Sequence, residues 1–181
     1  MTAVFINPQL YVQKNDKFTT GIVYMPIALA YLVAHFKSHN IKTQLLDLFG
    51  SSPKICTEEN GSLVFGKKID ELNLKDLNNA KCFFVYANQV ANHLSVIEII
   101  KYLKKKYPNI PISVLENSQA VTAYSLSKIR KEFLDIGCNY IVLGDLENPA
   151  LQLYKNLEEK KPISEVKGLI SKDFSNDRID F

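Results

Sequence analysis

Short apolar runs alternate along this chain with longer segments of helical periodicity. Apolar runs bounded by polar or turn residues predict buried strands, and apolar positions repeated every three or four residues predict helices. The predicted strands are residues 4–6, 42–48, 82–86, 112–115 and 140–143. The predicted helices are residues 26–36, 69–79, 95–107, 124–136 and 148–157. Residues 50–68 are expected to form a loop with a weak hairpin, and residues 168–170 a short strand within a polar tail.

Residue types at the ends of these segments support the assignment. Pro26 suits the first position of a helix, and the segment after it is apolar nearly all round, which predicts a well-buried helix. Ser95 and Glu98 have the spacing of a capping box. Gly137 lies where a helix end favours a left-handed residue. The last helix is expected to begin at Pro149, capped by the asparagine before it.

Strands that alternate with helices are typical of an α/β fold, in which helices cover both faces of a parallel sheet. We therefore expect five βα units and a five-stranded parallel sheet in a three-layer α/β/α domain, Rossmann-like or flavodoxin-like. The crossovers are expected to be right-handed. A length of 181 residues fits one domain, which we place at residues 1–165. Residues 166–181 are expected to be a tail or a linker toward a missing domain.

Composition and charge narrow the classes of function. With 46% hydrophobic and 23% charged residues, the chain has the composition of a globular protein. The formal net charge of +3 is too small to indicate nucleic-acid binding by itself. No apolar run approaches the roughly 18 residues of a membrane-spanning helix. The start lacks the basic region of a signal peptide. We therefore expect a cytoplasmic protein with neither nucleic acid nor membrane as a partner.

The residues that most often carry metal or covalent chemistry are few and scattered. Cys56, Cys82 and Cys138 form no CxxC pair, which disfavours a disulfide framework and a cysteine-based zinc or iron–sulfur site. We expect Cys82 in the core and Cys138 in a structural role. His35 and His39 are four residues apart but lack the glutamate of an HExxH motif, so no metal site is expected. No GxSxG motif indicates a nucleophile.

The predicted strand ends offer a binding site instead. Open α/β sheets bind ligands outside the carboxyl ends of their strands, near the topological switch point. Small polar, amide and carboxylate groups stand at these ends, at residues 7–8, 47, 87–89, 116–118 and 144–147. A nucleotide is disfavoured because no GxGxxG follows the first strand and no P-loop motif occurs. A receiver domain is disfavoured because Asn7 replaces its paired acids and no aspartate ends the third strand.

Several segments, taken together, resemble the opening domain of a known enzyme family. They are residues 4–8 (VFINP), 25–32 (MPIALAYL), 46–47 (LD), 105–114 (KKYPNIPISV), 137–147 (GCNYIVLGDLE) and 166–169 (VKGL). In order and spacing this set is similar to the N-terminal cobalamin (B12)-binding domain of B12-dependent radical SAM enzymes. Each motif alone is weak, whereas the ordered set covers nearly the whole chain.

This resemblance implies a cobalamin-binding module that places a corrinoid, a methyl carrier in many members, next to a catalytic barrel. The implied cofactor contacts are Asn7, Pro8, Asn88, Gln89, Val90, Glu116, Asn117, Ser118, Gly144, Asp145 and Glu147. S-adenosylmethionine and a 4Fe-4S cluster would belong to a missing downstream radical SAM catalytic domain, in cis or in trans, because no CxxxCxxC motif occurs here. The implied enzyme is methyltransferase-like and acts on an unknown small-molecule or peptide substrate.

The chain departs from the pattern of that family at several positions. The paired glycines after the fourth strand, which let the corrin approach the backbone, are Glu116 and Asn117 here, and a side chain there crowds a flat macrocycle. Other family positions hold Ala28, Gln9 and Leu146 in place of glycine, proline and glycine. One alternative is therefore a degenerate domain that binds no cobalamin and serves substrate or partner recognition. An unrelated flavodoxin-like module is another alternative.

Overall fold

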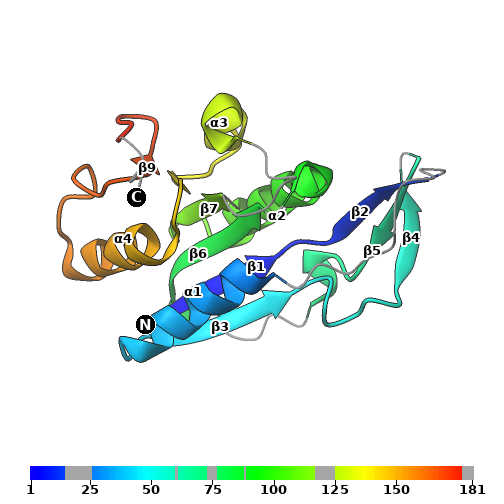
Figure 1. The fold of residues 1–181 in the computed structure, drawn as a ribbon, viewed down its shortest axis with the longest axis horizontal. Coiled ribbons are helices and arrows are strands. Elements are labelled where there is room, and N and C mark those ends of the chain that lie inside the picture. The colour runs from blue at the N-terminus through cyan, green and yellow to red at the C-terminus, as the bar shows by residue number, and fades with distance from the viewer. Residues whose placement is uncertain (15–25, 60, 73–76, 88, 117–124, 177–181) are drawn as a thin grey trace.

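Five parallel strands form the centre of the structure, a computed structural model that describes residues 1–14, 26–59, 61–72, 77–87, 89–116 and 125–176. The strands are β1 (Thr2–Asn7), β3 (Lys42–Asp47), β6 (Ala80–Ala87), β7 (Ile112–Glu116) and β8 (Tyr140–Val142). They lie in the order β3-β1-β6-β7-β8 (Figure 1). A further strand, β9 (Leu169–Ile170), pairs antiparallel with β8. The predicted α/β fold is confirmed, and β9 extends the sheet by one strand.

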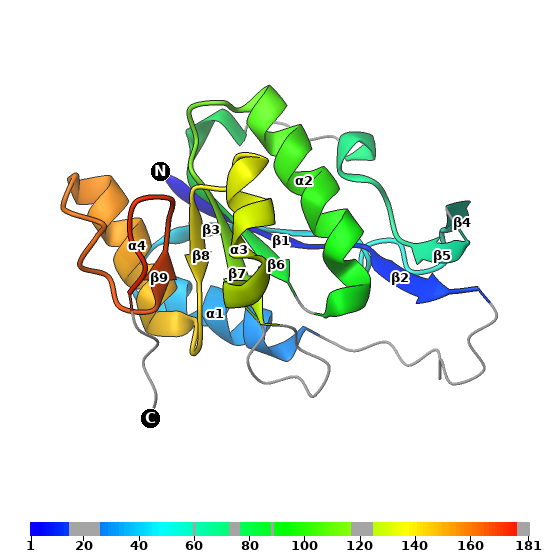
Figure 2. The same cartoon turned by 90° about the horizontal axis from the view of Figure 1, so that it is seen from above.

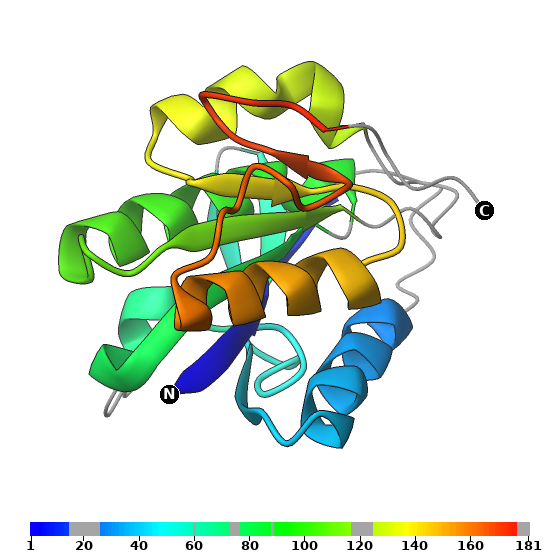
Figure 3. The same cartoon turned by 90° about the vertical axis from the view of Figure 1, so that its left-hand side faces the viewer.

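Helices cover both faces of this sheet. They are α1 (Ile27–Ser38), α2 (His93–Lys106), α3 (Leu126–Asp135) and α4 (Glu147–Glu159). Helices α1 and α4 contact each other on one face, and α2 and α3 pack on the other (Figures 1 and 3). The chain therefore has the three layers that the alternating pattern predicts.

The two faces of the sheet are filled by alternate residues of each strand, as the period of a strand requires. In β1, Val4 and Ile6 join the core under α2 and α3, whereas Phe5 joins the core under α1 and α4. Phe5 stacks on Phe84 with ring centroids 5.1 Å apart, and Phe36 of α1 meets Phe5 edge-on at 5.0 Å. Strands β1, β6 and β7 are buried on both faces, which explains why they read as continuous apolar runs, whereas the edge strand β3 is partly exposed.

A small antiparallel sheet extends beyond the carboxyl end of β1. It contains β2 (Leu10–Gln13), β5 (Ser62–Phe65) and β4 (Cys56–Glu59), in that order. The hairpin predicted within residues 50–68 is confirmed as β4 and β5. Strand β2 was not predicted, because it continues directly from β1 through Pro8 into a segment that reads as polar.

The connection from β3 to β6 differs from the other crossovers. Its described residues after the hairpin form two short 3-10 turns, η1 (Ile69–Glu71) and η2 (Leu77–Asn79), where a helix was predicted. The prediction of a helix at residues 69–79 is wrong for these parts, while residues 73–76 lie outside the described residues. The segment is rich in aspartate and asparagine, whose side chains compete with helical backbone hydrogen bonds.

Two predicted helix features are also corrected. Helix α1 was expected to be buried nearly all round, but only one side is covered, and Ile27 and Tyr31 are exposed. Ser95 does not begin a helix with Glu98: α2 starts two residues earlier, at His93, and no side-chain hydrogen bond caps it. The prediction for the end of α3 is confirmed, because Gly137 has a φ of +111°.

Residues beyond 165 continue onto the sheet. The predicted strand at residues 168–170 is confirmed as β9, and Phe174 packs against the core under α1 and α4. The side-chain amide of Asn176 donates hydrogen bonds to the carbonyls of Ser164 (2.9 Å) and Val166 (2.6 Å). The domain boundary at residue 165 stays a prediction. None of the helices in the described residues is long and apolar enough to cross a membrane.

Candidate functional site

The carboxyl ends of the five parallel strands meet at one edge of the sheet, which we call the carboxyl edge. The connections from β1 through α1 and from β6 through α2 leave toward opposite faces, so the topological switch point lies between β1 and β6. Helices α1 and α2 run antiparallel to the strands, and both begin at this edge (Figure 2). Ligands of open α/β sheets bind at such an edge.

One predicted site residue, Asn7, ends β1 beside the end of β3. Its side-chain amide donates a hydrogen bond of 2.8 Å to Asp47 Oδ1, and the backbone amide of Gly50 donates to the same oxygen at 2.7 Å. The backbone amide of Leu48 donates to the Asn7 carbonyl at 3.0 Å. These bonds use the Asn7 side chain to fix the end of β3, so its first role in this structure is to shape the edge.

A second group of polar side chains lies at the switch point. We call it the amide corner and define it as Gln9, Asn92 and Ser95. The backbone amide of Gln9 donates to Ser95 Oγ at 3.1 Å, and the Asn92 side-chain amide donates to the Gln9 carbonyl. Asn92 is only 4% exposed, and its Oδ1 is buried without a hydrogen-bond partner. A buried polar atom of this kind is uncommon in folded proteins and needs a structural or functional reason.

A third group lies between the ends of β7 and β8. We call it the carboxylate corner and define it as Glu116, Leu126 and Gly144. The Glu116 side chain is 6% exposed. Its Oε1 accepts the backbone amide of Leu126 at 3.1 Å, and its Oε2 accepts that of Gly144 at 3.2 Å. One carboxylate therefore connects the first residue of α3 to the loop between β8 and α4.

The local sequence explains why this carboxylate is held so well. The first backbone amides of a helix lack partners within the helix, and Ser125, which precedes α3, makes no capping hydrogen bond. Glu116 takes over that role, and a negative charge is favoured at a helix N-terminus. Gly144 has a φ of +78°, a conformation that glycine adopts without strain, and this turn presents its amide to Glu116.

The remaining predicted site residues fall into three groups. Pro8 is buried, Gln89 is half-buried just before a short 3-10 turn, η3 (Val90–Asn92), and Glu147 is half-buried at the start of α4. Val90 and Asp145 are exposed at the same edge. Asn88, Asn117 and Ser118 lie outside the described residues.

Large apolar side chains are exposed around this edge. At the starts of α1 and α2, Ile27 is 56% exposed, Tyr31 66%, Val90 59% and Leu94 50%. Exposed apolar groups gathered at one place often mark a binding surface. They flank the switch point from both faces of the sheet, because α1 and α2 lie on opposite faces.

Three residues of the amide corner were missed as site residues. Gln9 was noted only as the replacement for a proline, and Ser95 was assigned to a helix cap. Asn92 was not singled out. Its only local signal is its position just before an amphipathic helix, where an asparagine is ordinarily a cap. The contacts that reveal the corner join residues 83 and 86 positions apart in sequence.

The histidines and buried cysteines of the described residues lie outside these corners. Among the described residues no group of three histidine, cysteine, aspartate or glutamate side chains could hold a metal ion. His93 Nε2 lies 3.2 Å from Glu132 Oε2, which ties α2 to α3. Burial raises the pKa of the Cys138 thiol to about 12 and raises the pKa of the Cys82 thiol well above its usual value, so neither forms a thiolate readily.

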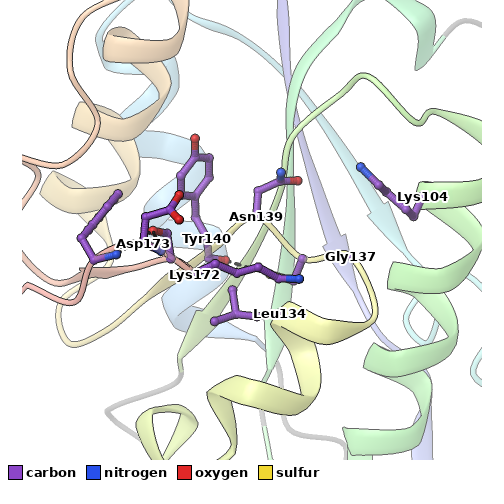
Figure 4. A pocket seen from close by; sticks show the side chains of 10 residues that line it. Lys104, Leu134, Gly137, Asn139, Tyr140, Lys172 and Asp173 are labelled. Atoms are coloured by element: carbon purple, nitrogen blue, oxygen red, sulfur yellow. Dashed lines mark hydrogen bonds between the residues drawn. The ribbon is translucent and has the colours of Figure 1, made fainter.

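A cavity of about 370 Å³ lies elsewhere, at the amino end of β8. Gly137, Asn139 and Tyr140 line it from the segment that enters β8, and Lys172 and Asp173 line it from the segment after β9 (Figure 4). Lys104 of α2 also lines it, while its Nζ donates a hydrogen bond to the Pro108 carbonyl. This cavity is at the opposite end of the strand from the carboxyl edge and is not part of the predicted site.

Comparison with known proteins gives structural neighbours only. No protein-family model matches this chain, and no curated protein matches its sequence. Among solved structures, the fold is similar to TsrM from Kitasatospora setae, a radical S-adenosylmethionine methyltransferase whose structure holds cobalamin and a 4Fe-4S cluster. The TM-score is 0.63 at 15% identity, over 94% of this chain and 27% of TsrM.

The fold is also similar to OxsB, a cobalamin-dependent S-adenosylmethionine radical enzyme, in its structure with aqua-cobalamin. The TM-score is 0.62 at 17% identity, over 99% of this chain and 22% of OxsB. This chain therefore spans about a quarter of the length of these neighbours. At such low identity the likeness establishes the fold, and these neighbours are cobalamin-dependent radical SAM enzymes.

Proposed function

We propose that this chain is a cobalamin-domain-like module of a radical SAM enzyme that binds no cobalamin and uses its carboxyl edge for substrate or partner recognition. The observation that carries this proposal is the carboxylate corner. Glu116 is buried, and its two oxygens accept backbone amides from the start of α3 and from the loop between β8 and α4. The likeness to TsrM and OxsB supports the type of module, whereas Glu116 favours the form without cofactor.

The residues at this corner do not fit cobalamin. The cofactor combines a flat corrin ring with a nucleotide tail that carries a phosphodiester. A ring or tail that reaches the backbone between β7 and β8 would have to displace the Glu116 side chain and break its two hydrogen bonds. The phosphodiester would also bring a second negative charge toward the carboxylate in a place of low dielectric. No step of a reaction is therefore derived through cobalamin.

The exposed apolar groups at the starts of α1 and α2 support a role in recognition. Ile27 and Tyr31 are exposed on one face of the sheet and Val90 and Leu94 on the other, and a catalytic domain or a substrate could cover either pair. In TsrM and OxsB a region of this fold is one part of a much longer radical SAM chain. We therefore propose a radical SAM catalytic domain, in cis or in trans, as the partner at the carboxyl edge.

The cofactor-free proposal is tested by mixing the purified chain with hydroxocobalamin, desalting it and recording the visible spectrum. We expect a colourless protein. TsrM from Kitasatospora setae, treated in the same way, is the positive control. A chain that retains cobalamin in a 1:1 ratio would contradict the proposal. Sequencing the gene beyond codon 181 tests the arrangement in cis, because a CxxxCxxC motif in frame would place the catalytic domain on the same chain.

A cobalamin-binding module is the second candidate, and one observation favours it. The Oδ1 of Asn92 is a buried acceptor without a partner at the switch point, and the rim of a corrin carries carboxamide groups that could donate to it. In that case Asn7, Pro8, Gln89, Val90 and Asn92 would be the residues of the described edge that hold the cofactor. Cobalamin would supply methyl transfer, while these residues orient the ring. If the wild-type chain binds cobalamin, Asn92→Leu should weaken that binding.

A further inference from the structure

The carboxylate corner joins three segments that are distant in sequence. Glu116 ends β7, Leu126 is ten residues further along the chain, and Gly144 is 28 residues further. One amide belongs to the first residue of α3 and the other to the loop between β8 and α4, and the two oxygens belong to one side chain. A ligand that takes the place of the Glu116 side chain has to compete with both hydrogen bonds.

Simple packing does not explain a carboxylate in this position. The other buried residues of this strand are uncharged. Ser113 is polar, and Val114 and Leu115 are apolar and pack on opposite faces of the sheet. A charged group buried at the strand end is tolerated only when hydrogen bonds compensate for the water it loses. At Glu116 both oxygens are compensated, so the closed arrangement is stable without any ligand.

We infer that Glu116 is a specificity-determining latch: it closes the edge between β7 and β8 and is the residue that makes this module reject cobalamin. The inference rests on the proposed cofactor-free function and names the side chain responsible for it. A latch of this kind predicts that a single substitution, Glu116→Gly, opens the edge. The amides of Leu126 and Gly144 then no longer donate to a carboxylate at this position.

The latch is tested by titrating hydroxocobalamin into three variants and the wild-type chain and following the visible spectrum. Glu116→Gly should raise the affinity by at least about tenfold. Glu116→Gln keeps the volume of the side chain and one good acceptor, so it should stay close to wild type. Val114→Ala is the matched control for loss of volume in the same strand and should also show no gain.

The outcomes separate this inference from the proposed function. Binding by the wild-type chain would contradict the proposed function. No binding by the wild type and no gain in a folded Glu116→Gly chain, checked by circular dichroism, would overturn the latch alone. An equal gain in Val114→Ala would overturn it as well, because the effect would then come from general loosening.

A measurement on the wild-type chain covers the case in which Glu116→Gly does not fold. Amide hydrogen exchange followed by NMR should show that the amides of Leu126 and Gly144 have one common protection factor once their intrinsic exchange rates are divided out. A single carboxylate holds both, so they open together. In Glu116→Gln at least one of the two should lose protection. Independent exchange of the two amides in the wild type, or unchanged protection in Glu116→Gln, would overturn the latch.

Discussion

At the carboxylate corner both oxygens of one side chain accept backbone amides, whereas at the amide corner the buried Oδ1 of Asn92 has no partner. Both corners belong to the same edge of the same sheet and both are buried. At the carboxylate corner each of the two carboxylate oxygens has a hydrogen-bond donor. The amide corner keeps an acceptor whose desolvation costs about 1–3 kcal/mol when it is left unsatisfied. The difference indicates that the amide corner is the part of the edge with a buried acceptor that still lacks a donor.

The positions of the two corners relative to the switch point connect this difference to ligand binding. The amide corner follows β1 and β6, so it lies at the switch point where ligands of this fold class bind. The carboxylate corner lies at the next strand along the same edge, where Glu116 at the end of β7 pairs with Ala87 at the end of β6. The amide corner therefore keeps a buried acceptor at the switch point, whereas the acceptors of the carboxylate corner already have donors. We therefore expect recognition to depend on Gln9, Asn92 and the exposed apolar groups beside them.

The largest effect on stability is expected at the carboxylate corner. Glu116→Ala removes both acceptors and leaves two buried amides unsatisfied, so we expect it to lower the free energy of unfolding by about 3 kcal/mol. Urea denaturation at constant pH measures the loss. Glu116→Gln, which keeps one carbonyl acceptor and the shape, should lose about half as much. A Glu116→Ala chain as stable as wild type would show that the corner is not held by the carboxylate.

Substitutions in the amide corner should lower the free energy of unfolding by less, even where they remove a hydrogen bond that is formed in the structure. Ser95→Ala removes the acceptor of the Gln9 backbone amide, which is buried, and should cost about 2 kcal/mol. The same urea titration measures it, with Ser38→Ala on the exposed end of α1 as a control that should cost less. A loss at Ser95 equal to that at Glu116 would remove the distinction between the two corners.

A smaller effect is expected from the backbone of the carboxylate corner. Gly144 has a φ of +78°, where a Cβ is disfavoured, so Gly144→Ala should cost about 1 kcal/mol. Gly61 has a φ of +77° in the β4–β5 hairpin, with open space around it, and Gly61→Ala is the matched control. Thermal unfolding of the two variants compares them directly. A larger loss at Gly144 than at Gly61 would indicate that the turn also positions the amide for Glu116.

The sequence predicts the edge much better than it predicts the corners. Phe5 and Val85 belong to short apolar runs that predict buried strands from the local sequence. The ends of such runs place Asn7, Glu116 and Gly144 at strand ends. Glu116 was found through its place in a family pattern, not through its contacts. Its two hydrogen bonds depend on how α3 and the β8–α4 loop return to the sheet, and no local pattern encodes that.

The amide corner was missed for a related reason. Ser95 stands three residues before Glu98, which imitates a capping box, so its local pattern indicates a helix start. In the structure its hydroxyl instead accepts an amide 86 residues away, and α2 begins at His93. The strand β2, which positions Gln9, was also missed because its pairing partner β5 is distant in sequence. Contacts of long range, rather than residue type, define this corner.

The smallest effect on stability is expected at Asn92, whose buried Oδ1 has no hydrogen-bond partner. Asn92→Ala loses the hydrogen bond from its side-chain amide to the Gln9 carbonyl, and it also removes the unsatisfied Oδ1. The two changes are of similar size and opposite sign, so the free energy of unfolding should change by no more than about 0.5 kcal/mol. Urea denaturation beside Ser95→Ala measures it. A loss of 2 kcal/mol or more, about the value for Ser95→Ala, would show that the Oδ1 has a partner within the fold. A near-zero change would leave that acceptor free for recognition, as expected of the unsatisfied corner.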